Sequence, residues 1–238
     1  MDRPIGFALD DFQALPPPGP PLIAGQHMQL ERLEAARHGA DLFAALQGHD
    51  WVWDYMGSGP FADARAFDAW LGSVQDGTDP FFYAIRDRAT GRAGGFASYL
   101  RIEPKHGVIE IGFIMIAPRL QRTPAATEAI SAMISWAFEQ GYRRVEWKCD
   151  ALNAASMTAA RRFGFVYEGT FRQHAIYKSR NRDTAWFAIT DQDWQRLREA
   201  HRRWLDPANF DAEGRQRTSL SSLTTAIAQL FCAASRRS

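Results

Sequence analysis

One stretch of the sequence has residue types that fit the binding of an anion. An apolar run from Glu110 to Ile116 leads through a short loop into a helix expected to begin near Pro124. Thr123 is suited to cap that helix, and Pro124 suits its first position because the N–H that proline lacks would have no partner there. The amides of residues 125–127 would point outward at the positive end of the dipole, where a pyrophosphate fits. A normally capped helix without a ligand explains the same residues.

Motifs for several other chemistries are missing from the sequence. It has no Gly-x-Gly-x-x-Gly after a strand, no Gly-Lys-Ser/Thr phosphate loop and no Gly-x-Ser-x-Gly turn. The six histidines lack metal-ligand spacing, as do the two cysteines, Cys149 and Cys232. We therefore expect no metal site and no disulfide framework, and we expect a reducing compartment, the cytoplasm.

A second motif makes the expected chemistry more specific. Asn153-Ala-Ala-Ser is followed by seven residues, by Gly-Phe at 164–165 and by Glu-Gly at 168–169. This spacing, downstream of a Gln-x-x-x-x-Ala loop at 121–126, resembles the GNAT superfamily of acyl-CoA-dependent N-acetyltransferases. Within that superfamily it is most similar to the RimJ/RimL-type, ribosomal-protein-alanine acetyltransferase group. The resemblance extends over residues 26–189, most of the chain.

The resemblance implies a site for acetyl-CoA. The loop would hold the pyrophosphate, the end of the preceding strand would pair its backbone with the pantetheine amides, and Asn153 would contact the pantetheine arm. Ser156 stands where related enzymes place a hydroxyl near the CoA sulfur, so it would return a proton to the departing thiolate. A helix cap or a serine on a helix face is the structural alternative. The expected cofactor-binding residues are Ile114, Met115, Ile116, Gln121, Arg122, Thr123, Ala125, Ala126, Thr127, Asn153 and Ser156.

One loop position departs from the family pattern. The loop usually reads Gln/Arg-x-x-Gly-x-Gly/Ala, whereas this chain has Pro124 at the first glycine and Ala126 at the last position. Proline removes one amide that would face the phosphates. Because neighbouring amides, Thr123 and Arg122 remain, we expect a working variant of the site.

Two residues are candidate bases for the acceptor amine, which must lose its proton to attack the thioester. Glu110 matches the place of the catalytic glutamate in some GNAT enzymes, and a glutamate that only pairs with arginine is the alternative. His174 ranks second. It lies close to the place of a catalytic glutamate in some RimL-type relatives, although Ala175 holds that place itself. A lone histidine in a strand is more often structural.

The acceptor would be a primary amine, at a protein or peptide N-terminus or on a small molecule. An α-amino group is about a tenth neutral at pH 7, a lysine amine only a few parts in ten thousand, so a weak base favours the α-amine. An aromatic loop at 49–56 stands where relatives bind the acceptor. Its expected substrate-binding residues are Trp51, Trp53, Tyr55 and Met56. We expect at least two residues of this aromatic cluster, which Phe61 completes, to pack in the core instead.

The segment 178–187 resembles the hairpin that completes the sheet in this branch of the family. Arg180, Arg182 and Asp183 could recognise a carboxylate on the acceptor. A solvated turn is the simpler explanation of those three charges.

The hydrophobic pattern supplies a scaffold for these residues. Alternating runs predict strands from about residue 26 and at 81–86, 93–101, 108–116, 144–149, 165–171 and 184–189. Apolar residues at helical spacing predict helices at 35–46, 62–74, 124–140 and 153–163. The expected fold is α/β, with a mixed, mostly antiparallel sheet of six to seven strands flanked by helices, which is the GNAT fold.

Three parts are expected along the chain. Residues 1–25 read as a stiff, proline-rich arm, 26–190 as the GNAT domain and 191–238 as a helical, arginine-rich extension. An apolar helix face at 219–231 would dock on the domain or on a second subunit, so a homodimer through the extension is one expectation.

Composition narrows the classes of partner. The 238 residues are 46% hydrophobic, enough for a substantial core. With 28 basic against 27 acidic residues the formal charge is +1, so we expect no general attraction to nucleic acid. No apolar run approaches the length of a membrane span, and we expect no membrane partner.

The sequence therefore predicts an N-acetyltransferase that moves an acetyl group from acetyl-CoA directly to an amine. Glu110 would be the base and Ser156 the acid, and a backbone N–H near Ile116 would polarise the thioester carbonyl. The alternative is a non-catalytic acyl-CoA-binding or interaction module with the same fold, which Pro124 and the two extensions favour. An acetyltransferase that detoxifies a small molecule would differ only in its acceptor.

Overall fold

The computed structural model describes the backbone of residues 5–234 and the side chains of residues 5–227. Its strands are β1 (Leu22–Ala24), β2 (Met28–Arg32), β3 (Phe81–Asp87), β4 (Arg92–Glu103), β5 (Val108–Ile116), β6 (Arg144–Asp150), β7 (Val166–Tyr177) and β8 (Arg180–Thr190). Its helices are α1 (Ala35–Leu46), α2 (Ala64–Val74), α3 (Pro124–Glu139), α4 (Ala154–Arg162), α5 (Asp191–Leu205) and α6 (Leu220–Ala234), with short 3-10 turns η1 (Asp50–Trp53) and η2 (Pro207–Asn209).

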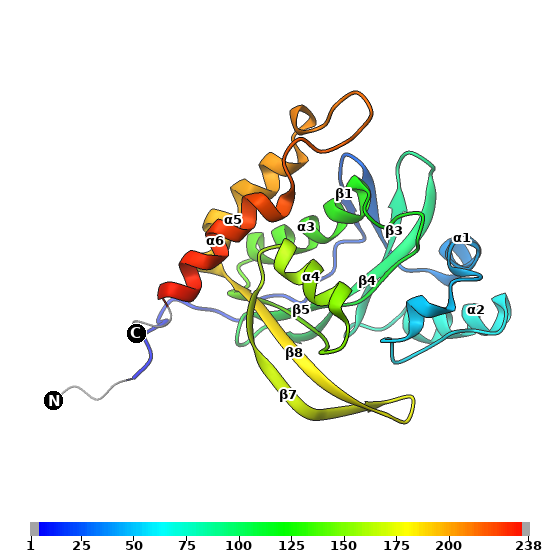
Figure 1. The fold of residues 1–238 in the computed structure, drawn as a ribbon. Helices are drawn as coiled ribbons and strands as arrows, with labels where there is room; N and C mark the ends of the chain where they lie inside the picture. The colour runs from blue at the N-terminus through cyan, green and yellow to red at the C-terminus, as the bar shows by residue number, and fades with distance from the viewer. Residues whose placement is uncertain (1–4, 235–238) are drawn as a thin grey trace.

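The strands form one eight-stranded sheet in the order β1-β2-β3-β4-β5-β6-β8-β7 (Figure 1). Every neighbouring pair is antiparallel except β5 and β6, which are parallel. The expected mixed, mostly antiparallel sheet is thus confirmed. The prediction of six to seven strands was too low, because the end of the proline-rich arm pairs with β2 as β1. Three residues in a proline-rich context carry too little alternation to predict a strand.

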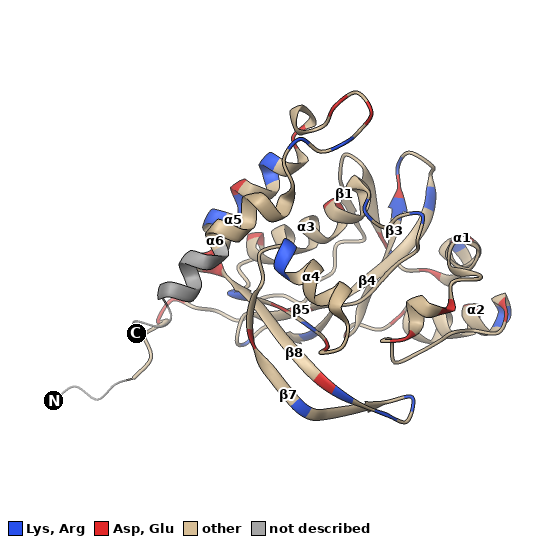
Figure 2. Ribbon diagram, in the orientation of Figure 1, with Lys and Arg blue, Asp and Glu red and all other residues tan. Residues whose placement is uncertain are grey.

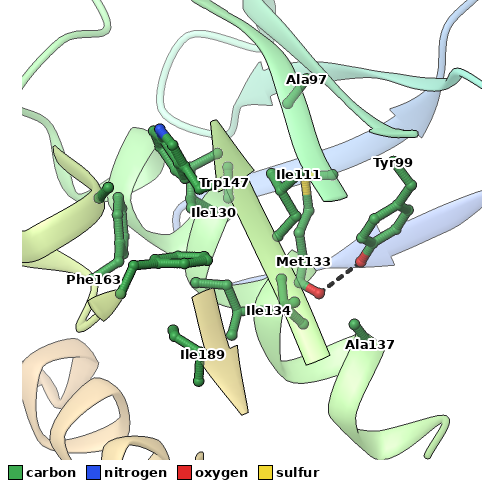
Figure 3. Close-up of a cluster of buried hydrophobic side chains, with 14 of the residues drawn as sticks. Ala97, Tyr99, Ile111, Ile130, Met133, Ile134, Ala137, Trp147, Phe163 and Ile189 are labelled. Atoms are coloured by element: carbon green, nitrogen blue, oxygen red, sulfur yellow. Dashed lines mark hydrogen bonds between the residues drawn. The ribbon is translucent and has the colours of Figure 1, made fainter. Parts of the chain in front are cut away.

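The helices cover both faces of the sheet. On one face α3, α4 and α5 pack against β4, β5, β6 and β8, and Figure 3 shows the centre of that core. There the Tyr99 hydroxyl donates a hydrogen bond of 2.7 Å to the Met133 carbonyl of α3. On the other face α1, η1 and α2 pack on β3 and β4, with Leu42, Phe67 and Phe96 fully buried. In the described part of the chain this second core does not reach β6, β7 or β8.

The proline-rich arm lies along the domain. The Leu15 amide donates to the Pro104 carbonyl, and the hydroxyls of Tyr142 and Tyr83 donate to carbonyls of the arm at Pro16 and Pro20. Because proline has a backbone carbonyl but no N–H, the two tyrosine hydroxyls bind the arm through the carbonyls of its prolines.

Glu128 of α3 binds the turn that joins β1 to β2. Its carboxylate is buried and accepts the backbone amides of Gln26, His27 and Met28 at 2.7, 2.6 and 3.2 Å. Gly25 lies so close that an added Cβ would stand 2.5 Å from this carboxylate. One buried glutamate therefore fixes the end of the arm to the helix that begins beside the candidate site.

The C-terminal extension docks on its own domain. α5 packs on α3, and α6 packs on α5, α4 and β7. Leu220 and Thr224 are fully buried, and the Thr224 hydroxyl donates to the Arg162 carbonyl at 3.0 Å. The expected apolar face at 219–231 thus contacts the same chain over its first two turns, while its side chains from 228 on lie outside the described residues. The homodimer stays a prediction. No helix within the described residues is long and apolar enough to cross a membrane.

His201 joins α5 to the turn after α4. Its Nε2 lies 2.9 Å from the Phe163 carbonyl, and its Nδ1 lies 3.1 Å from the Ser131 hydroxyl of α3. A neutral ring with its hydrogen on Nε2 satisfies both contacts, since the hydroxyl can donate to Nδ1.

This histidine should make stability depend on pH. Burial lowers the pKa of His201 to about 4 from 6.5. Between these values the unfolded chain binds a proton that the folded chain does not, so stability is complete above pH 6.5 and is lost as pH falls towards 4. We expect His201→Gln to be less stable than the wild type at pH 7. Between pH 6.5 and 4 its free energy of unfolding, measured in urea, should fall by up to about 3 kcal/mol less than that of the wild type. Parallel stability curves for the two proteins would contradict this.

Candidate active site

The two parallel strands at the centre of the sheet separate halfway along their length. Strands β5 and β6 pair only at Val108 with Arg144, Ile109 with Val145 and Glu110 with Glu146. Both strands continue beyond this point, to residues 116 and 150. The result is a V-shaped gap in the sheet, whose edges are the unpaired second halves of β5 and β6.

A bulge turns β5 away from β6. The register between β4 and β5 moves from Ser98 opposite Gly112 to Phe96 opposite Met115, so β5 has one residue more than β4 across this step. Phe113 has a positive φ of 47°, which non-glycine residues adopt rarely. Ile114, Met115 and Ile116, three of the predicted cofactor residues, follow this bulge, and Met115 is buried in the core under α1 and α2.

Glu110 lies at the last shared pair of the two strands. Its side chain is 2% exposed, and its Oε2 is 3.4 Å from the Lys148 Nζ and 3.3 Å from the Arg101 Nε. Neither contact has hydrogen-bond geometry, so this oxygen accepts no hydrogen bond within the described residues. Burial raises the pKa of Glu110 to about 7, although Lys148 and Arg101 oppose the rise. The carboxyl can therefore exchange a proton near neutral pH.

Trp186 of β8 connects Glu110 to the outer strands. Its ring lies 5.1 Å from the Arg101 guanidinium and 5.3 Å from the Lys148 ammonium. On its other side it contacts Phe171 and His174, at ring separations of 5.3 and 6.0 Å. The sequence analysis did not identify Arg101, Lys148 or Trp186. The one available signal was that Lys148 is among only three lysines in the chain, in an otherwise apolar strand.

The loop after β5 has the predicted cap. Thr123 Oγ1 accepts the Ala126 amide at 3.2 Å, and Pro124 is the first residue of α3. The Gln121 side chain donates to the Ile116 carbonyl at 3.0 Å, which ties the loop to the end of β5. Within the described residues the amides of Arg122 and Ala125 have no acceptor.

Thr127 is already engaged by the protein. Its amide and its hydroxyl both donate to the Thr123 carbonyl, and its hydroxyl accepts 2.9 Å from the Arg162 guanidinium of α4. The loop therefore offers fewer free amides than the sequence predicted, because the backbone amides of Ala126 and Thr127 already donate hydrogen bonds to Thr123.

Asn153 and Ser156 meet at the start of α4, across the gap from this loop. Asn153 Oδ1 caps the helix by accepting the Ser156 amide at 3.0 Å. The Ser156 hydroxyl accepts 3.0 Å from the Trp147 indole N–H. Because indole only donates, the hydroxyl keeps its own hydrogen for another acceptor. Cys149 adjoins it; burial raises the pKa of this thiol, and the Ser156 hydrogen bond opposes the rise.

His174 lies on β7 and not beside Glu110. Its Nδ1 is 2.9 Å from the Thr184 hydroxyl of β8, and its ring packs edge-on against Phe171. His174 contacts Trp186, whereas Glu110 contacts Lys148 and Arg101, and no contact joins the two candidate bases within the described residues.

The aromatic loop divides into core and surface residues. Trp53 is only 3% exposed and packs in the core with Phe61, and Met56 packs against the same core. Trp51 and Tyr55 are exposed, at 56% and 41%. The core alternative thus accounts for Trp53 and Met56, because the turn η1 directs them under α2.

The same loop contacts the end of β6 and the tip of the β7–β8 hairpin. The Tyr55 hydroxyl donates to the Leu152 carbonyl between β6 and α4 at 3.2 Å, and the Lys178 ammonium at the tip of the β7–β8 hairpin donates to the Trp53 carbonyl at 2.8 Å.

Of the three charged residues expected to lie in a solvated turn of the β7–β8 hairpin, one is buried. Arg180 is exposed, and Asp183 accepts the Gln173 amide at 2.7 Å, but Arg182 is 8% exposed. The described residues include no group of three or more His, Cys, Asp or Glu side chains that could hold a metal ion.

Comparisons with known proteins agree with this geometry. The family model described as an acetyltransferase (GNAT) domain matches residues 27–166. A GCN5-related N-acetyltransferase from Brucella melitensis is 40% identical, with a TM-score of 0.89 over 91% of this chain and 100% of that one. A GNAT-family protein from Chromobacterium violaceum is 41% identical, with a TM-score of 0.77 over 81% of this chain and 98% of that one.

More distant structures share the fold alone. An acetyltransferase from Salmonella typhimurium that modifies the N-terminal serine of ribosomal protein L7/L12 is 20% identical, with a TM-score of 0.60 over 70% of this chain and 96% of that one. No curated protein matches the chain. The gap between β5 and β6, the capped loop before α3 and the match over more than half of the sequence lead to one conclusion: the chain belongs to the GNAT acetyltransferase family.

Proposed function

We propose that this GNAT acetyltransferase transfers an acetyl group from acetyl-CoA directly to a primary amine, with Glu110 as the base. The observation that carries the proposal is a deeply buried carboxyl whose pKa of about 7 lies at the operating pH, placed where β5 and β6 separate. A base is most effective when its pKa is close to the working pH, because it is then both ionised and able to hold a proton.

The gap and the adjoining loop fit acetyl-CoA as the co-substrate. Arg122 and Ala125 offer free amides at the positive end of the 16-residue helix α3, and the exposed Arg122 side chain adds a charge for the pyrophosphate. The free edge of β5 after Glu110 offers backbone groups to the two amides of a pantetheine arm, as a neighbouring strand would. Pro124 is compatible with this role because the cap at Thr123 forms normally.

Glu110 would remove the proton of the amine directly or through one water. At neutral pH about half of the Glu110 carboxyls are ionised. The nearby Lys148 and Arg101 keep the ionised form accessible despite its burial. His174 is the weaker candidate, because its ring is held by Thr184 on an outer strand.

Ser156 would return a proton to the departing thiolate. The Trp147 indole fixes the position of the Ser156 oxygen, and the hydroxyl hydrogen, which the Cys149 thiol accepts when no ligand is bound, would turn to the CoA sulfur. The place of the serine at the start of α4, on the β6 side of the gap, is the one that the resemblance assigns to this acid.

A free α-amino group is the first acceptor class to test. The Salmonella relative modifies an N-terminal serine, and an α-amine needs less help from a base than a lysine does. The competing function is a module that only binds acyl-CoA. Such a module would bind acetyl-CoA but would release no CoA, whichever amine is added.

Turnover should depend on the ionisation of Glu110. We expect kcat/KM of the wild type to rise with pH and to level above about 7, because the base works when deprotonated. Glu110→Gln should lower kcat about a hundredfold or more and move the rise to the pKa of the acceptor amine, because only the neutral amine then reacts. CoA release with acetyl-CoA and an amine panel, from pH 5.5 to 9, measures both. His174→Asn is the matched control and should keep the profile; an unchanged profile in Glu110→Gln would exclude Glu110 as the base.

The same variant has a separate effect on stability. Between pH 4.5 and 7 the unfolded chain has released a proton that folded Glu110 retains, so wild-type stability falls as pH rises through this window. Glu110→Gln has no such loss. Its stability relative to the wild type should grow by up to about 3 kcal/mol between pH 4.5 and 8 in urea unfolding. A constant difference would mean that Glu110 ionises at its ordinary pKa.

The proposed role of Asn153 in binding acetyl-CoA can be tested with a substitution that keeps the cap of α4. Serine at this position still accepts the Ser156 amide but lacks the carboxamide N–H groups that would reach the pantetheine arm. We expect calorimetry to show acetyl-CoA binding about fivefold weaker in Asn153→Ser, the effect of about one hydrogen bond. Asp63→Ser, which replaces the cap of α2 in the same way, should bind normally. Equal affinity in both variants would show that Asn153 only caps α4.

A further inference from the structure

Arg182 has a largely buried side chain without an ion-pair partner among the described residues. Its side chain is among the buried residues, at 8% exposed, and its Nε makes no hydrogen bond. No carboxylate among the described residues lies within ion-pair distance of it. Its one recorded contact is the ring of Tyr177, 4.5 Å from the guanidinium carbon. Burying a charge without a partner is costly, so this group points to an anion that the protein alone does not supply.

Arg182 belongs to the same face of the sheet as Glu110. Side chains alternate along β8, so Arg182 shares a face with Thr184 and Trp186. Trp186 is opposite Lys148 on β6. Lys148 is two residues after Glu146, which is opposite Glu110, so all of these side chains share one face. This face therefore presents Glu110, its two cations, Trp186 and Arg182 in succession.

Arg182 also acts on the end of β6, where the gap is open. Its charge is close enough to Cys149 to oppose the burial that raises the pKa of that thiol. Cys149 itself is opposite Ala185, so its side chain lies on the other face of the sheet, where it adjoins Ser156. The Trp186 indole nitrogen, on the same face as Arg182, is a second buried donor that lacks an acceptor within the described residues. Arg182 and Trp186 thus each have one unsatisfied donor on this face of the sheet.

The neighbouring acids are already engaged. Figure 2 shows charged residues of both signs on the distal half of the β7–β8 hairpin. Asp183 points to the opposite face and accepts from Gln173 and Asn181, and the Asp150 carboxylate accepts the Leu152 amide at 2.8 Å. Asp183 is thus directed away from Arg182, and the Asp150 carboxylate makes no ion pair with it.

We propose that Arg182 binds a carboxylate of the acceptor, so that the preferred acceptors are amines that carry a carboxylate in the same molecule. This inference rests on the proposed function. The planar guanidinium presents its donors as a fork that matches the two oxygens of a carboxylate, and the Trp186 N–H offers a further bond. The aromatic surroundings, Tyr177 and Phe171, favour this weakly hydrated pair over a fully hydrated phosphate.

A carboxylate can reach the site from two sources. One is a free α-amino acid, and the other is a peptide N-terminus with an acidic side chain. The test uses matched pairs for each: glycine and alanine against their amides, and N-terminal peptides with Glu against Gln at the second position. Only the carboxylate differs within a pair.

The expected result is a preference that depends on Arg182. Wild-type kcat/KM should favour the carboxylate member of at least one pair about tenfold or more, as expected for a charge-assisted hydrogen bond. Arg182→Met should reduce that preference to about twofold and leave the rate with the amide member and the KM for acetyl-CoA unchanged. Arg180→Met, on the exposed part of the same hairpin, should keep the wild-type preference.

Three results overturn the inference. The first is equal rates within every pair for the wild type, and the second is a preference that survives Arg182→Met. The third is a higher KM for acetyl-CoA in Arg182→Met with the preference intact, which would assign Arg182 to the co-substrate. Failure of the proposed function looks different, because then no amine of either kind releases CoA.

Thermal unfolding gives a readout that does not need turnover. If the charge of Arg182 is unpaired without a ligand, Arg182→Met should melt at the wild-type temperature or above it. N-acetylglycine, a carboxylate product, should raise the melting temperature of the wild type more than N-acetylglycinamide does, and this difference should vanish in the variant. A lower melting temperature for Arg182→Met together with no effect of N-acetylglycine on the wild type would assign Arg182 a structural role with Tyr177.

Discussion

The separation of β5 from β6 is the constraint on which the rest of the molecule depends. Parallel strands bury their backbone groups in continuous hydrogen bonding, yet these two share only three residue pairs. The bulge at Phe113 takes β5 out of register and leaves backbone groups of the central sheet without partners. Such groups must be satisfied by water or by a ligand, so the fold holds open a slot that an extended, amide-containing molecule can fill.

Long-range contacts hold this slot open from both sides. On the β5 side, α3 is fixed by Glu128, which binds the end of the arm, and by Tyr99, which donates to the Met133 carbonyl. On the β6 side, α4 is fixed by Trp147 through Ser156 and by α6 through Thr224. The arm and the C-terminal extension therefore help to position the helices that border the gap.

The sequence predicted what local rules determine. Alternation and helical spacing located most strands and helices, and Thr123-Pro124 and Asn153 were predicted at the starts of helices, where the structure has them as caps. Local rules do not show which distant side chains meet. The bulge at Phe113 lacks a glycine to mark it, and the cluster around Glu110 depends on the register of four strands. Arg182 was expected either to recognise an acceptor carboxylate or to lie in a solvated turn, and its burial depends on the pairing of β7 with β8, which local rules do not give.

The cations on this face of the sheet would act on both the proposed base and the proposed acceptor. Lys148, Arg101 and Arg182 are three cations on the face that carries Glu110 and Asp150, where Glu146 is already paired with Arg144 at 2.7 Å. Cations nearby disfavour an ammonium ion, so an amine held here loses its proton more easily than in water. A carboxylate on the same molecule supplies the attraction that the amine alone would lack. The arrangement that would bind a carboxylate-bearing acceptor is therefore the one that would prepare its amine for attack.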